Sequence, residues 1–134
     1  MTFSDNPADN HMHISRRFIR QADEELANGD HIQASEKAWG AVAHYFKAIA
    51  ARRDWRQTRH RDYYTNMELL GEETADKEEF RRFFMVADGL HANFYNDYMS
   101  AEQVSESIED ARKFIDMLDD IEADATETLS LIHI

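Results

Sequence analysis

The chain contains no cysteine, a single proline and only four glycines in 134 residues. The absence of cysteine excludes disulfide bridges and thiol catalysis. The scarcity of glycine and proline disfavours a sheet protein, because many hairpins would need these residues in their turns. Hydrophobic residues still make up 43% of the chain, which is enough to bury a core. We therefore expect one all-α domain, since this length suits a single core.

Long apolar runs are also missing from the sequence. No stretch approaches the roughly 20 apolar residues that cross a bilayer. The first residues, MTFSDNPADNHMHISRRF, lack the basic segment followed by an apolar segment that marks a signal peptide. We therefore expect a cytoplasmic protein that has no membrane partner.

Charge is unevenly distributed along the chain, whose net charge is −12 with histidine neutral. Such an excess of acid repels nucleic acid on average. Five arginines nevertheless lie between Arg52 and Arg61, whereas the segment 102–127 is strongly acidic. Any anionic ligand is expected at the Arg53–Arg61 connection. The alternative is that these arginines serve the end of a helix and neutralise the acidic segment.

Helix caps and apolar spacing divide the chain into helices. Gly29 is expected to end the first helix in a left-handed conformation, and Asp30 to cap the second. The predicted helices cover about 14–28, 30–53, 60–71, 77–97 and 101–123. We assign residues 1–12 to a flexible tail, 13–124 to a helical bundle and 125–134 to an apolar tail.

The second of these helices is predicted to lie at the centre of the bundle, because apolar residues cover about half of its circumference. Small residues such as Ala34 and Ala38 on one flank would let another helix approach closely. Glu36, Lys37 and Lys47 fall on the remaining strip, which we interpret as a solvated edge. The predicted core consists of Trp39, Val42, Phe46, Phe84, Leu90 and Ile115.

Three blocks of sequence carry a resemblance to a known family. They are GDHIQASEKAWGAVAHYFKAIA, then His60, then ADGLHANFYNDYMSAEQV. In order and spacing they resemble the PaREP-type branch of the HEPN-like helical bundles over about residues 15–120. The resemblance implies an up-and-down bundle of four to five helices that pairs as a homodimer. HEPN domains include metal-independent ribonucleases of toxin–antitoxin and defence systems, partners of minimal nucleotidyltransferases, and inactive binding modules.

The ribonuclease members of that group are similar in carrying an arginine, a polar residue and then a histidine. Arg53, Asp54 and His60 formally fit this pattern, with six residues between the arginine and the histidine. In the family the pattern lies late in the domain, whereas here it joins the second and third helices. His91 is a further candidate, since a histidine titrates near neutral pH. The alternative for His91 is a core or interface residue whose nitrogens are satisfied by a neighbouring acid.

The candidate ligand-binding residues come from three places. Lys37 and Lys47 match the lysines of the family pattern, and Arg53, Arg56 and His60 belong to the basic connection. The fourth helix adds His91, Asn93 and Tyr95.

No metal site or cofactor is predicted from the sequence. A carboxylate-bridged bundle would need Glu-x-x-His pairs on two helices, and none occurs. We expect a non-catalytic, homodimeric binding module for a nucleotide, a short RNA or a protein partner. The alternatives are a metal-independent ribonuclease that uses Arg53, His60 or His91, and an antitoxin-like interaction protein. The dimer is expected because the helices and the tail residues Leu129, Leu131, Ile132 and Ile134 offer more apolar surface than one small bundle needs.

Overall fold

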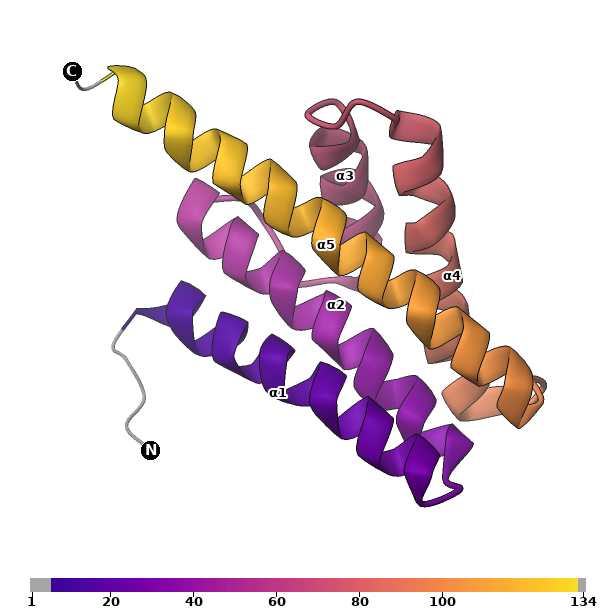
Figure 1. The fold of residues 1–134 in the computed structure, drawn as a ribbon. Coiled ribbons are helices and arrows are strands. Elements are labelled where there is room, and N and C mark those ends of the chain that lie inside the picture. Colours follow the sequence, from indigo (N-terminus) through magenta and orange to yellow (C-terminus); the bar gives the residue numbers. More distant parts are fainter. Residues whose placement is uncertain (1–5, 133–134) are drawn as a thin grey trace.

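A computed structural model describes residues 6–132, with the side-chain environments of residues 6–128. This part of the chain forms an all-α bundle and contains no strand (Figure 1). The helices are α1 (Pro7–Ala27), α2 (His31–Arg53), α3 (His60–Gly71), α4 (Lys77–Asn96) and α5 (Ala101–Ile132). The predicted fold class is confirmed.

Side-chain caps begin three of the helices, at Asp30 for α2, Asp76 for α4 and Ser100 for α5. The carboxylate of Asp30 accepts a hydrogen bond from the Gln33 amide at 3.0 Å, and α2 starts there. Ser100 and Gln103 bond each other's backbone N–H groups at the start of α5. Gly29 has a φ of +80°, so the chain turns between α1 and α2 in the left-handed region that glycine adopts without strain.

Two helix ends differ from the prediction. Helix α1 begins at Pro7 rather than near residue 14, so residues 7–12 are helical and do not belong to a loose tail. Asn6 caps it by accepting the Ala8 amide at 2.9 Å, and proline is well suited to the first helical position. Helix α5 continues past residue 123 to Ile132, because neither glycine nor proline interrupts the segment. Ile134 and the side chains of residues 129–132 lie outside the described residues.

Helix α2 occupies the centre of the bundle, as predicted. It packs against α1 on one side, against α3 and α4 on the other, and against α5. The predicted core residues are all buried, and Phe46 is 1% exposed. The centroid of the Phe46 ring lies 5.6 Å from that of Phe84 and 5.9 Å from that of Phe114, so the Phe46 side chain packs against both α4 and α5.

Helix α1 packs closely along α2. Gly40 makes this possible, since a Cβ at that position would lie 2.7 Å from an atom of the Phe18 ring. Ser15, which is buried, donates its hydroxyl to the carbonyl of Ala41 at 2.6 Å. Asp119 of α5 completes the contact by accepting hydrogen bonds from the Arg16 guanidinium and the Tyr45 hydroxyl. Burial and the bond to Asp119 raise the pKa of Tyr45.

Phe46→Ala should lower the free energy of unfolding by about 3–5 kcal/mol, because it removes a ring that contacts three helices and leaves a cavity. Urea denaturation checks this value. Leu69→Ala is the control, since Leu69 is 46% exposed and its loss should cost under about 1 kcal/mol. A similar loss in both variants would show that Phe46 is not at the centre of the core.

Candidate functional site

Two predicted site residues, His60 and His91, lie next to each other in the structure. His60 is the first residue of α3, and His91 lies near the end of α4. Their ring centroids are 5.5 Å apart and the rings are inclined by only 22°. The side chain of His60 is 46% exposed and that of His91 is 28% exposed. Solvent can therefore reach both imidazoles.

A carboxylate holds each of these rings in place. His60 donates from Nε2 to Asp88 at 3.1 Å, and His91 donates from Nδ1 to Glu36 at 3.1 Å. In each ring the other nitrogen is left to meet a ligand or exchange a proton, because the carboxylate fixes which nitrogen carries the hydrogen. The pair can thus accept a hydrogen bond, donate one, or act as acid and base.

Asp88 is also the hydrogen-bond acceptor for the hydroxyl of Tyr64. Burial, together with the bond to the Asp88 carboxylate, raises the pKa of Tyr64 to about 12. Tyr64 therefore stays protonated at neutral pH and continues to donate to Asp88. The Asp88 carboxylate therefore accepts hydrogen bonds from both His60 and Tyr64, which hold it in place next to the His60 ring.

The two histidines line a hollow of about 300 Å³. Trp39 lies beside both rings, with its centroid 5.7 Å from that of His60 and 5.3 Å from that of His91. The hollow is completed by Tyr63 and by two cationic side chains, Lys47 and Arg59. Aromatic rings and positive charge therefore meet at one place.

A second hollow, of about 420 Å³, lies along the basic connection. Its cationic residues are Arg56, Arg59 and Arg61, and Trp55 and Leu69 supply apolar surface. Arg59 lines this hollow and the histidine hollow as well, so the two adjoin through one side chain. We refer to them below as the arginine hollow and the histidine hollow.

Asp62 is the buried acid in the arginine hollow. Its carboxylate accepts the backbone N–H groups of Arg59 and Thr58 at 2.9 and 3.0 Å. These bonds are the main reason why the pKa of Asp62 is lowered. Asp62 also makes looser ion pairs with Arg59 at 3.4 Å and with Arg56 at 3.8 Å. Since backbone groups already satisfy Asp62, the guanidinium groups keep donors for a ligand.

Arg53 is not part of either hollow. It donates to Glu73 at 2.5 Å and to Glu122 of α5 at 3.1 Å, and it lies over the ring of Trp55. Arg52 reaches Glu122 as well, at 3.2 Å. These two arginines follow the alternative interpretation, in which they neutralise acidic residues. The structure therefore does not pair Arg53 with His60, as the ribonuclease pattern would require.

The remaining predicted residues are divided between the site and the rest of the fold. The ring centroid of Tyr95 lies 5.3 Å from that of His91 in an edge-to-face arrangement, and Tyr95 is 70% exposed, so it lies beside a residue that lines the histidine hollow. Lys47 lines the hollow, whereas Lys37 lies over Phe18 at 4.5 Å, at the contact with α1. Glu36, which the sequence suggested was only a solvated edge, is the partner of His91.

Asn93 is fully buried, and its side chain forms hydrogen bonds within the fold. Its amide donates to the Ser35 hydroxyl at 2.9 Å. Its carbonyl oxygen accepts the backbone N–H groups of Tyr98 and Met99, at 2.9 and 2.8 Å. Asn93 therefore fastens the α4–α5 turn to the start of α2. Its position next to exposed Tyr95 gave no sign of this burial in the sequence.

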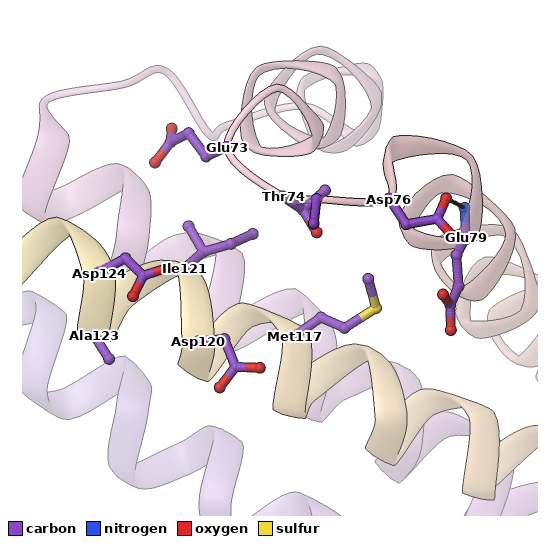
Figure 2. Close-up of a pocket in the computed structure, with 10 residues that line it drawn as sticks. Glu73, Thr74, Asp76, Glu79, Met117, Asp120, Ile121, Ala123 and Asp124 are labelled. Atoms are coloured by element: carbon purple, nitrogen blue, oxygen red, sulfur yellow. Dashed lines mark hydrogen bonds between the residues drawn. The ribbon is translucent and has the colours of Figure 1, made fainter.

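A third hollow, of about 490 Å³, lies between the α3–α4 connection and α5, in the region shown in Figure 2. Carboxylates from both segments line it, together with Met117 and Ile121 of α5. The acidic residues are Glu73, Asp76, Glu79, Asp120 and Asp124. Anions would be repelled here, so this hollow does not compete with the cationic ones.

Among residues 6–132, no group of three or more histidine, aspartate or glutamate side chains is placed to hold a metal ion. None of the described helices is long and apolar enough to cross a membrane.

Comparison with known proteins identifies a family. The family model described as the archaeal PaREP1/PaREP8 family matches residues 10–115. No curated protein and no solved structure matches the chain.

Asn93→Ala should lower the free energy of unfolding by about 2–4 kcal/mol, because it leaves a buried hydroxyl and two partly buried N–H groups without their partner. Thermal or urea denaturation measures the loss. Asn96→Ala, on the exposed side of the same helix, is the matched control and should change stability by less than about 1 kcal/mol. Equal stability of the two variants would show that the hydrogen bonds of Asn93 do not stabilise the fold.

Proposed function

The chain belongs to the archaeal PaREP1/PaREP8 family, and we propose that it binds a nucleotide or the end of a short RNA without cleaving it. The observation that carries this proposal is the adjoining pair of hollows, one lined by aromatic rings and the other by arginines, which share Arg59. A nucleotide consists of a base, which stacks on aromatic rings, and phosphates, which bind cationic side chains. A site for it therefore needs both kinds of surface close together.

The histidine hollow suits the base and the arginine hollow suits the phosphates. His60 and Tyr95 expose ring surface on which a base can stack, and stacking of this kind is worth about 1–3 kcal/mol per base. The side chains of Arg59 and Arg56 are 43% and 64% exposed, and guanidinium groups bind phosphate oxygens through paired hydrogen bonds. Because the rest of the protein is strongly acidic, a ligand of one or a few nucleotides fits better than a long strand.

The relation to HEPN-like bundles is part of this proposal. It is supported by the all-α architecture and by the family match, and it suggests that binding without catalysis is one of the roles open to this chain. The formal ribonuclease pattern is weakened, since Arg53 is occupied by Glu73 and Glu122.

A ribonuclease is the second candidate, and one observation favours it. His60 and His91 are neighbours, and each is oriented by a carboxylate, as an acid and a base need to be. One ring would take the proton of the attacking 2′-hydroxyl while the other would give a proton to the leaving oxygen.

Binding is tested by calorimetric titration of ADP and of a short adenine RNA oligonucleotide into the full chain. Arg56→Glu/Arg59→Glu should lower the affinity at least about tenfold, because two guanidinium contacts to phosphate are replaced by repulsion. Arg20→Glu/Arg82→Glu is the control; both of its arginines are exposed, and it changes the net charge equally.

An equal loss in the control would mean that binding depends only on overall charge, and unchanged affinity in the first variant would place the site elsewhere. The RNA recovered from these mixtures, kept in a metal chelator, decides between the two candidates. Intact RNA supports binding alone, whereas cleavage that His60→Gln abolishes would assign the ribonuclease.

The protein is further proposed to act as a homodimer. Support comes from the large apolar side chains that this single chain exposes, which include Met85 and Tyr95 on the outer side of α4, with Tyr98 just beyond. A two-fold contact through this side would bury them and bring two copies of the histidine hollow near each other.

Light scattering at micromolar concentration should give about twice the chain mass of 15.7 kDa. Met85→Glu should shift the mass toward the monomer, because it places a charge in the proposed contact. The control is Leu69→Glu, which adds the same charge at an exposed apolar residue of α3. A monomer in the unmodified protein would refute the dimer.

A further inference from the structure

A second pair of histidines lies across α2 from the first, at the contact with α1. His11 of α1 and His44 of α2 place their Nδ1 atoms 3.0 Å apart, with ring centroids separated by 5.2 Å. The Phe18 ring meets His44 edge-on at 5.5 Å and covers one side of the pair. Both rings are partly buried.

The bond between the two Nδ1 atoms limits how many protons this pair can hold. In the neutral pair one ring donates from Nδ1 and the other accepts. One added proton preserves the bond and leaves an Nε2–H on both rings, so the pair then carries a single positive charge. A second added proton would set one N–H group against another and break the bond.

The surroundings of this pair are cationic. Lys47 follows His44 by one helical turn, and Lys37 and Arg17 both lie over the ring of Phe18. Burial and the charge of Lys47 lower the pKa of His11. Burial first, and then Lys47, His11 and Arg17, lower the pKa of His44 to about 4.

These cations have not been neutralised by the rest of the protein. Arginines elsewhere in the bundle form ion pairs, as Arg16 does with Asp119 and Arg112 with Asp23. Within residues 6–128, Arg17, Lys37 and Lys47 form no ion pair with a carboxylate. Glu36, the acid on the exposed strip of α2, is bonded to His91. A chain of net charge −12 thus keeps a small area of unpaired positive charge between α1 and α2.

We propose that His11, His44, Lys47 and Arg17 form a binding site for an oxyanion, such as a phosphate group, and that the histidine pair takes up one proton when the anion binds. The bound anion supplies the negative charge that is missing next to these cations, at the contact between α1 and α2. Its presence offsets the repulsion between the added proton and Lys47, so binding and protonation favour each other. This site shares Lys47 with the histidine hollow, but it contains neither of the arginines, Arg56 and Arg59, that are proposed to bind the phosphates of a nucleotide.

Sulfate is the probe for this site, because it does not titrate near neutral pH. Calorimetric titration at pH 5.5 in buffers of different ionisation enthalpy measures how many protons are taken up with it. Net proton uptake on sulfate binding, with chemical-shift changes at His11 and His44, is the expected result. Binding without proton uptake, or without changes at these two rings, would overturn the proposal.

Variants and a second ligand sharpen the test. Lys47→Met should weaken sulfate binding about fivefold, as expected for one charge-assisted contact, whereas Lys113→Met on α5 should not. His44→Gln should abolish the proton uptake. Arg56→Glu/Arg59→Glu should leave the sulfate response intact, so failure of the nucleotide site and failure of this site are distinguishable.

A 5′-mononucleotide distinguishes a phosphate ester from a free oxyanion as the natural occupant. If it shifts the His11 and His44 resonances of the Arg56→Glu/Arg59→Glu variant at lower concentration than sulfate does, the site takes esters. If sulfate acts at lower concentration, it takes a free oxyanion. If neither ligand shifts them, the assignment is wrong.

Discussion

Helix α2 must touch every other helix of the bundle, and most features of the molecule depend on that constraint. Its residues are divided by size: Ala34, Ala38 and Ala41 are small and fully buried, whereas Trp39 and Phe46 extend toward α3 and α4. Only a narrow strip of α2 remains uncovered. The two histidine pairs lie on either side of this strip, because it is where the side chains of α1 and those of α3 and α4 meet solvent.

Ion pairs divide the positive charges of the protein into two groups. Arg16, Arg52 and Arg53 bind carboxylates of α5, so they hold that acidic helix against α1 and α2. Exposed pairs of this kind each contribute little, about 0–1 kcal/mol. The second group, which includes Lys47 and Arg59, faces away from α5 toward the hollows. The arginine-rich segment thus contains residues with different roles.

The sequence was sufficient to predict the helical class, the central helix, the caps and the core, because these depend on residues close together in the chain. It also showed the resemblance to the PaREP family. It did not reveal that α1 begins at Pro7, since the polar residues there obscured the Asn6 cap. The pairing of His60 with His91 depends on how α3 packs against α4, and no local pattern contains that information. The burial of Asn93 and the ion pairs of Arg53 could not be predicted for the same reason: their partners, Ser35 and Glu122, lie far away in the sequence.

The turn between α1 and α2 has a consequence for how the chain folds. Asn28, Gly29 and Asp30 join two long antiparallel helices whose contact is the most extensive in the bundle (Figure 1). Closing so short a loop costs little entropy, so this helical hairpin can assemble before distant segments have met. Helix α5 packs against α1, α2 and α4, so its complete contact forms only once those three helices have come together. The oxyanion site would then exist in the first part of the protein to form, and the histidine hollow would appear later, once α3 and α4 have docked.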